Sequence, residues 1–392
     1  MNILLVHNHY RQPGGEDSVF FSEKMLLSDQ GHNVFFYTAN NAQLEKFSAA
    51  GMIRNTLWNQ KSYWDLRYLI SKHSVQVAHF HNTFPLISPS AYYAAKSENI
   101  PVVQTLHNYR LLCPNALFFR AGHVCEDCLG RFVPWPGVLR RCYRGSIAAS
   151  GVVATMLTFH RVLGTWKRMV DVYVALTEFA RQKFIKAGFP AEKIVVKPNF
   201  VYPDPGVGEG KAGFTLFVGR LSPEKGLDTL LVAWERLEGK LPLKIVGDGP
   251  LAGKVIEATQ RLIGVEWLGR RSREEVLALM KEASFLIFPS ISHEGFPMTI
   301  VEAFAVGLPV LASNIGNMSN LIDPGRTGFH FRAGDSEDLA AKVEWAWAHT
   351  RQLMEMRREA RAEYEAKYTA EKNYEMLMNI YQLAISRAKG RG

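Results

Sequence analysis

The chain has 392 residues, more than one ordinary hydrophobic core holds and enough for two domains of about 180–200 residues each. Apolar residues make up 47% of it and charged residues 21%, as is typical of globular proteins, and no apolar run reaches the roughly 18 residues that a membrane-spanning helix needs. The net charge of +9 is uneven, because residues 1–198 hold 22 Lys and Arg against 12 Asp and Glu, whereas the remaining residues hold 24 against 25. The basic first half predicts an anionic partner such as phosphate, a membrane surface or nucleic acid.

Strands and helices alternate along the first half. The chain begins without a basic region before its first apolar run, so we expect a strand at Asn2–Val6 rather than a secretion signal, and a cytoplasmic protein. Further strands are predicted at Val34–Tyr37, Val75–Phe80, Val102–Leu106, Val172–Ala175 and Ile194–Lys197. This alternation predicts a parallel, doubly wound α/β sheet.

Two segments of the first half follow predicted strands, where a parallel sheet binds its ligands. Gly14, Gly15 and Glu16 come after the first strand, and glycine lets the backbone approach phosphate or sugar closely; the alternative is a plain turn. His107 ends another strand and is a candidate ligand contact, although a single histidine is more often structural. A structural role is the interpretation that we favour for His79 and His81.

All four cysteines lie within one short segment of the first half. Cys125 and Cys128 form a C-x2-C pair, with Cys113 and Cys142 on either side. Four thiolates would hold one structural zinc ion in a loop that lacks a core, although the usual ribbon has two such pairs. Reduced thiols and disulfides are the alternatives.

A basic and aromatic stretch overlaps the end of the cysteine segment and surrounds an apolar helix expected at Ile147–Phe159. Its members are Arg131, Trp135, Arg140, Arg141, Arg144, Trp166, Lys167 and Arg168. This pattern predicts docking onto an anionic membrane, and the alternative is a buried helix with a solvated basic rim.

Proline and glycine accumulate over residues 199–213, which we interpret as a linker. It separates a first domain, residues 1–198 with a cysteine-rich insertion at 113–142, from a second domain at 214–368. The alternation restarts in the second domain, and the charged residues 369–392 are expected to form a helix that returns to the first domain. The predicted strands of the second domain are Thr215–Val218, Leu243–Val246, Val265–Leu268, Phe285–Phe288, Val310–Ala312 and Gly328–Phe331.

Two segments of the second half suit a diphosphate with hydroxyl groups on either side. Arg220 and Lys225 follow its first strand and offer a bidentate and a mobile cation. Glu294 lies in the loop before a helix that holds Glu302, and a helix start attracts anionic oxygens. Ordinary turns with solvated charges are the alternative.

In order and spacing, Arg220-x4-Lys225, Gly247-Asp-Gly-Pro and Glu294-x7-Glu302 resemble the retaining glycosyltransferases of family 4. The resemblance covers the whole chain and is strongest at residues 214–330. It implies the GT-B fold, with two Rossmann-like parallel-sheet domains that face a cleft. It also implies transfer of a sugar from a nucleoside-diphosphate sugar to a glycan or lipid-linked acceptor, with retained configuration, in the biosynthesis of a surface polysaccharide.

The resemblance assigns roles in the second domain. Arg220 and Lys225 would hold the donor diphosphate, and Glu294 would contact the transferred sugar. Glu302 would bind the ribose, and the loop at Arg270 would meet the base. Pro297, expected in the first helical turn where many relatives have glycine, has no N–H, so backbone contacts to the donor are assigned to Gly295, Phe296, Met298 and Thr299.

In the first domain, the resemblance implies that Gly15 closes over the donor while Gly14 and Glu16 border the acceptor. His107 would lie beside the sugar ring. The basic and aromatic stretch around residues 147–159, together with the basic first half, leads us to expect an acceptor on a lipid diphosphate carrier at the inner leaflet of the plasma membrane.

No Asp-x-Asp pair is present to hold a catalytic metal, which fits leaving-group stabilisation by cations and a helix start without metal or organic cofactor. By resemblance, a donor phosphate oxygen takes the acceptor proton. Alternatives are a sugar-nucleotide epimerase or a glycogen-type polymerase on the same fold, or a non-catalytic glycan- or nucleic-acid-binding protein. A nucleic-acid partner is not expected of the transferase.

Overall fold

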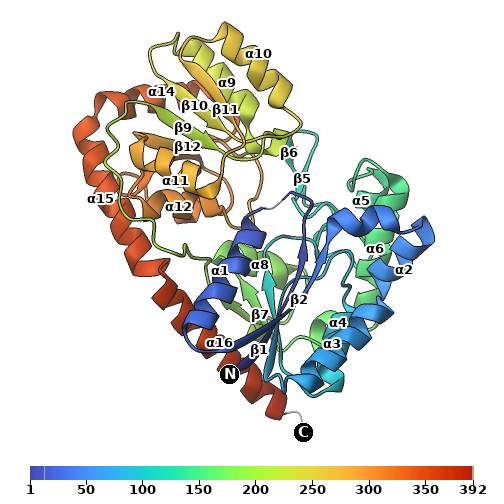
Figure 1. Ribbon diagram of the computed structural model, residues 1–392. Helices are drawn as coiled ribbons and strands as arrows, with labels where there is room; N and C mark the ends of the chain where they lie inside the picture. Colours follow the sequence, from blue (N-terminus) through green and yellow to red (C-terminus); the bar gives the residue numbers. More distant parts are fainter. Residues whose placement is uncertain (13, 391–392) are drawn as a thin grey trace. The chain divides into compact units, whose positions relative to one another are not determined.

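A computed structural model describes residues 1–12 and 14–390, and it divides into two compact units (Figure 1). Unit 1 comprises Met1–Phe118, Glu126–Asn199 and Ala370–Gly392, and unit 2 comprises Phe119–Cys125 and Phe200–Thr369. In the part of the chain that the structure describes, we find no helix with the length and apolar character needed to cross a bilayer.

Unit 1 contains a parallel six-stranded sheet in the order β2-β1-β3-β4-β7-β8. Its strands are β1 (Asn2–His9), β2 (Asn33–Asn40), β3 (Val77–Asn82), β4 (Val102–Leu106), β7 (Val172–Ala175) and β8 (Ile194–Val196). The chain reverses its direction of travel across the sheet between β1 and β3, which makes the carboxyl ends of these strands the switch point where such sheets bind ligands.

Helices cover both faces of this sheet, since successive side chains of β1 point to opposite sides. Leu4 and Val6 belong to the core under one layer of helices, and Ile3 and Leu5 pack on the other side with Tyr381 of the last helix. The helices of unit 1 are α1 (Gly15–Asp29), α2 (Ala49–Leu57), α3 (Gln60–Lys72), α4 (Ser90–Ser97), α5 (Trp135–Leu139), α6 (Ile147–Val162), α7 (Thr165–Arg168), α8 (Glu178–Lys186) and α16 (Ala370–Lys389), with 3-10 turns η1 (Asn41–Lys46) and η2 (Ala191–Lys193).

Unit 2 contains a second parallel six-stranded sheet, in the order β11-β10-β9-β12-β13-β14. Its strands are β9 (Thr215–Val218), β10 (Leu243–Val246), β11 (Val265–Gly269), β12 (Phe285–Phe288), β13 (Val310–Ser313) and β14 (Gly328–Phe331), and a hairpin pairs β5 (Phe119–Arg120) with β6 (His123–Val124). This is the doubly wound order of a dinucleotide-binding sheet, and its switch point lies between β9 and β12.

The helices of unit 2 pack on both faces of its sheet. They are η3 (Pro223–Lys225), α9 (Leu227–Arg236), α10 (Ala252–Arg261), α11 (Arg273–Glu282), α12 (Met298–Ala305), α13 (Met318–Leu321), α14 (Ser336–Ala348) and α15 (Thr350–Lys367). The prediction of two Rossmann-like, doubly wound parallel sheets is confirmed. One local prediction is wrong: Pro297 does not lie in the first turn of α12 but precedes it as the N-cap, with the extended ψ of 91° that N-cap residues adopt.

The residues predicted to form a linker pack onto unit 2. The N–H of Gly208 donates to the carbonyl of Val306 at 2.9 Å, and the N–H of Gly210 donates to the carbonyl of Lys281 at the same distance. Arg361 of α15 forms two hydrogen bonds with the carboxylate of Asp204, at 2.9 and 2.7 Å. These bonds fix most of this segment to one unit, so its role as a linker between two domains remains a prediction.

Candidate functional site

The loops after β9 and β12 meet at the switch point of unit 2. Lys225 Nζ lies 2.8 Å from Glu294 Oε1, and the same oxygen accepts a hydrogen bond from Ser290 Oγ at 2.6 Å. The two charged side chains are partly exposed, at 23% for Lys225 and 15% for Glu294. The structure therefore brings together two of the residues that the sequence selected, and adds Ser290.

Gly226 explains why the two loops lie so close together. Its φ is +70°, and a Cβ at this position would stand 1.8 Å from the carbonyl oxygen of Pro289. Only glycine fits this backbone, so the turn after Lys225 rests directly on the end of β12. Ser290 Oγ also lies 3.0 Å from the carbonyl oxygen of Glu224, so this hydroxyl group stands between the two loops.

The backbone of the Glu294 loop is held by Asn317, a buried side chain next to α13. Its amide donates to the carbonyl of Glu294 and, at 2.8 Å, to the carbonyl of Gly295. The sequence patterns gave no signal for Asn317, because its partners are backbone groups that are distant in the chain.

Glu302 lies in α12 with a side chain that is 15% exposed, and its partner is Arg273, whose Nε lies 3.3 Å from Glu302 Oε1. Burial raises the pKa of the Glu302 carboxyl, although Arg273 opposes the shift. Sequence reasoning also missed Arg273.

The remaining donor candidates of unit 2 lie at the same carboxyl edge. Arg220 and Arg270 follow β9 and β11 and are exposed, and no ion pair among the described residues involves either of them. Gly295, Phe296, Met298 and Thr299 are partly exposed around the start of α12. The first N–H groups of an α-helix have no intrahelical acceptor, so this start offers donors to an anion.

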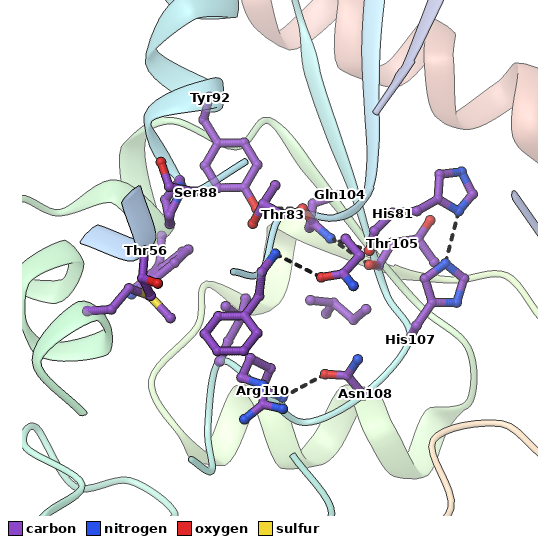
Figure 2. A pocket seen from close by; sticks show the side chains of 17 residues that line it. Thr56, His81, Thr83, Ser88, Tyr92, Gln104, Thr105, His107, Asn108 and Arg110 are labelled. Atoms are coloured by element: carbon purple, nitrogen blue, oxygen red, sulfur yellow. Dashed lines mark hydrogen bonds between the residues drawn. The ribbon is translucent and has the colours of Figure 1, made fainter. Parts of the chain in front are cut away.

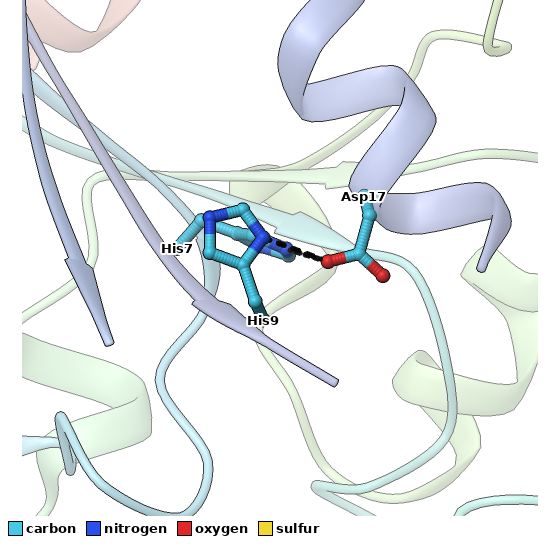
Figure 3. Close-up of side chains that lie close together, drawn as sticks. All are labelled: His7, His9 and Asp17. Carbon is cyan, nitrogen blue, oxygen red and sulfur yellow. Dashed lines mark hydrogen bonds and ion pairs between the residues drawn. The ribbon is translucent and has the colours of Figure 1, made fainter. Parts of the chain in front are cut away.

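In unit 1, the end of β1 and the start of α1 are joined by one carboxylate (Figure 3). Asp17 Oδ1 accepts hydrogen bonds from His7 Nε2 at 3.0 Å and from His9 Nδ1 at 2.8 Å, and Asp17 Oδ2 accepts from the N–H of Gly14 at 2.9 Å. Burial lowers the pKa of His7 to about 4, so the ring is neutral. Burial would raise the pKa of Asp17, but these hydrogen bonds outweigh it and lower that pKa.

This group anchors the glycine loop that the sequence selected. The sequence prediction missed His7, His9 and Asp17, although His-x-His in a strand places both rings on one face. Gly14 itself has an ordinary φ of −128°.

Glu16 lies beside this anchor and is partly exposed. Its two carboxylate oxygens accept hydrogen bonds from the amides of Asn82 and Asn108, each at 3.0 Å. Burial raises the pKa of Glu16 to about 7; the hydrogen bond from Asn108 opposes this shift and the nearby Asp17 adds to it. The predicted acceptor residue is thus a carboxyl group that changes charge near neutral pH.

A cavity of about 40 Å³ lies among residues at and after the ends of β3 and β4 (Figure 2). His107 lines it, together with His81, Asn108 and Arg110. His81 Nδ1 and His107 Nε2 are 3.0 Å apart. His79 instead bonds Tyr381 and Thr105 inside the unit, which agrees with the structural role expected for it.

The cysteines form no disulfide, so that alternative is wrong. The sulfur of Cys113 donates to Asn115 Oδ1 at 3.0 Å, and that of Cys128 to the carbonyl of Pro134 at 3.8 Å, as reduced thiols do. In the described residues, the groups of three side chains whose ligand atoms lie within 4.8 Å of one another are His7/His9/Asp17 and Glu23/His79/His81. A zinc ion on Cys113, Cys125, Cys128 and Cys142 stays a prediction, which metal analysis of the purified protein would test.

Two family models match the chain. A model described as Glycosyltransferase Family 4 matches residues 24–204, and one described as Glycosyl transferases group 1 matches residues 206–363. Among curated proteins, the D-rhamnosyltransferase WbpZ of Pseudomonas aeruginosa is 34% identical over 161 residues, which are 40% of this chain and 42% of the relative. The O-antigen chain mannosyltransferase C of Escherichia coli is 31% identical over 172 residues, or 43% of this chain and 46% of the relative. Each match thus spans less than half of the relative's length.

Solved structures are similar along almost the whole chain. Alr3699/HepE of Anabaena, in complex with UDP, has a TM-score of 0.69 at 18% identity and covers 97% of this chain and 100% of its own. A sucrose-phosphate synthase of Thermosynechococcus elongatus has a TM-score of 0.72 at 14% identity and covers 98% and 99%. At such identities the similarity concerns the fold.

Proposed function

The chain belongs to glycosyltransferase family 4 and has the GT-B fold, and on this premise we propose that it transfers a sugar from a nucleoside-diphosphate sugar to an acceptor hydroxyl. The observation that carries the proposal is the ion pair of Lys225 and Glu294 at the switch point of unit 2. The exposed Arg220 lies in the same loop as Lys225. The named relatives are sugar transferases, which supports transfer rather than an epimerase or a non-catalytic binding protein.

In this proposal, unit 2 binds the nucleotide sugar through charge. The diphosphate gains negative charge as its bond to the sugar breaks, so fixed cations stabilise the transition state more than the bound donor. Arg220 and Lys225 supply the cations, and the N–H groups of Met298 and Thr299 supply further donors at the start of α12. Glu294 holds the Lys225 ammonium in place and accepts hydrogen bonds from sugar hydroxyls.

The remaining roles rest on the family resemblance. Arg270 meets the base, Glu302 binds the ribose, and Gly295 and Phe296 line the sugar. Gly15 approaches the donor, while Gly14 and Glu16 contact the acceptor. The acceptor hydroxyl attacks from the face that the nucleotide leaves, a phosphate oxygen takes its proton, and the configuration is retained.

A binding experiment tests this proposal. UDP, GDP, ADP and dTDP are screened by thermal shift, and at least one is expected to raise the unfolding temperature, because a ligand that binds the folded state stabilises it. The shift should be lost in R220A and K225A and kept in K240A, which removes an exposed cation of the same unit. If none of the four stabilises the protein, or if all variants respond alike, the proposal is wrong.

We further propose that the acceptor is carried by a lipid diphosphate and that unit 1 binds an anionic inner membrane leaflet. Large apolar side chains are exposed near α5 and α6, among them Phe132 (58%), Trp135 (50%), Leu139 (68%) and Val162 (67%). Cations accompany them, and the guanidinium of Arg131 lies 5.2 Å from the Trp135 ring centre. Apolar side chains and cations on one surface favour an anionic bilayer.

Flotation with liposomes tests membrane binding. The protein is expected to float with vesicles that contain anionic lipid at low salt, and not with neutral vesicles. W135S/L139S should remove most of the binding, whereas I263S, at a residue of unit 2 that is 78% exposed, should not. Equal flotation of both variants would contradict this surface.

A further inference from the structure

A buried chain of four polar side chains ends at the cavity of unit 1. Lys197 Nζ lies 2.8 Å from Glu23 Oε1, and Glu23 Oε2 lies 3.3 Å from His81 Nε2. His81 Nδ1 in turn lies 3.0 Å from His107 Nε2. All four residues are buried, with exposures between 0% for Lys197 and 9% for His107. We call this chain the Glu23 relay.

The charges of the relay decide how its protons are placed. Glu23 is held as an anion, because Lys197 and the neighbouring His81 ring outweigh the burial that would raise its pKa. The ion pair of Lys197 and Glu23 has no net charge. A proton added to the His81 or His107 ring would leave an uncompensated charge away from water, which burial disfavours.

A neutral imidazole has one donor nitrogen and one acceptor nitrogen. The position of the proton in one ring therefore determines its position in a ring that is hydrogen-bonded to it. Glu23 Oε2 and His81 Nε2 lie 3.3 Å apart, and neither atom has a hydrogen bond of standard geometry among the described residues. A proton on His81 Nε2 makes their contact attractive, whereas a lone pair there would face the anion. His81 Nδ1 then carries the lone pair, and the proton of the next hydrogen bond belongs to His107 Nε2.

The second ring nitrogen of His107 therefore carries a lone pair. Within the described residues, His107 Nδ1 has no hydrogen bond, and this nitrogen is not fully buried. Burial lowers the pKa of His107 well below its usual value, and His81, His7 and His79 lower it further while Glu23 opposes them, which agrees with a neutral ring. A lone pair accepts a hydrogen bond from a hydroxyl group, not from a phosphate oxygen.

We propose that Glu23 and His81 are positioning residues that hold His107 with its proton on Nε2, so that Nδ1 accepts a hydrogen bond from a sugar hydroxyl. The identity of the ligand rests on the proposed function, but the position of the proton does not. His81, for which the sequence favoured a structural role, acts in this proposal on the ligand through His107.

Nitrogen-15 NMR of histidine-labelled full-length protein tests the proton position. In the wild-type protein at pH 7, the His107 resonances, assigned by their loss in H107N, should show a protonated Nε2 and an unprotonated Nδ1. The variant E23L/K197M replaces the buried ion pair by apolar residues, and folded protein should then show a mixture of both tautomers. D171N/K96M removes another ion pair of unit 1, one with a buried carboxylate and a partly exposed lysine, and is the control.

The outcomes separate this inference from the proposed function. A proton on Nδ1 in the wild-type protein, or an unchanged tautomer in folded E23L/K197M, overturns the relay whatever the enzyme transfers. For the ligand, UDP-glucose is the probe: once it is bound, the Nδ1 resonance should move, whereas UDP alone should leave it in place. An unmoved resonance in the UDP-glucose complex overturns the contact to the sugar and leaves the transferase proposal intact.

Discussion

Lys225 and Glu294 form an ion pair of 2.8 Å at the switch point of unit 2 although 69 positions separate them in the chain. The carboxylate neutralises an ammonium that would otherwise face solvent alone, and it keeps the Lys225 side chain where the loops after β9 and β12 meet. A dianionic diphosphate can use this cation, since a partly exposed ion pair rearranges at little cost.

Replacement of Lys225 by methionine should weaken the binding of the nucleoside diphosphate about 10- to 100-fold, because a charged hydrogen bond contributes about 1.5–3 kcal/mol. Isothermal titration of wild type, K225M and K240M checks it. K240M changes the same charge at an exposed site of unit 2 and should bind like wild type. An unchanged dissociation constant in K225M would remove this residue from the donor site.

Alanine at Gly226 should destabilise unit 2 by at least about 3 kcal/mol, since a positive φ alone costs about 1–3 kcal/mol and the new Cβ would overlap the Pro289 carbonyl. Chemical denaturation of G226A is the measurement. G253A is the control, because a Cβ on that helical glycine of α10 meets nothing within 4 Å and alanine suits a helix better. Equal stability of G226A and wild type would show that the loops do not rest on each other as described.

Glu16 should make the stability of the protein fall as the pH rises. Its folded pKa is about 7 and its usual value 4.5, so between these values the folded state holds more protons than the unfolded state. Stability therefore decreases from about pH 4.5 to about pH 7 and is level above. The unfolding temperature of E16Q should drop less between pH 5 and pH 8 than that of wild type, while E375Q, at an exposed residue, should follow wild type. Parallel curves for E16Q and wild type would contradict the raised pKa.

Much of the fold and part of the site could be predicted because their signals are local. Apolar runs broken by Gly and Pro placed the strands of both sheets, and Lys225 and Glu294 each lie in the loop that follows such a run. In a parallel sheet, the residues that follow the strands lie at the same edge. A shared binding site for them could therefore be predicted before the strand order was known.

The partners of these residues could not be predicted, because they depend on which elements become neighbours. His81 meets His107 only because β3 lies beside β4, and Glu23 of α1 contacts His81. Arg273 of α11 forms an ion pair with Glu302 of α12. The backbone dihedrals of Pro297 make it the N-cap of α12 and not a residue of its first turn. Spacing along the chain contains no information on such contacts.

Asn317 supports the loop that carries Glu294, and no contact of Asn317 with the ligand is proposed. N317A leaves the carbonyls of Glu294 and Gly295 without their buried donor, which should cost about 1–3 kcal/mol of stability. The loop that carries Glu294 then loses its fixed position, so affinity for the nucleotide sugar should fall more than affinity for the nucleoside diphosphate alone. Denaturation and titration of N317A, with S319A on α13 as the control, check both effects; a stable N317A with unchanged affinities would show that Ser290 and Lys225 suffice to hold Glu294.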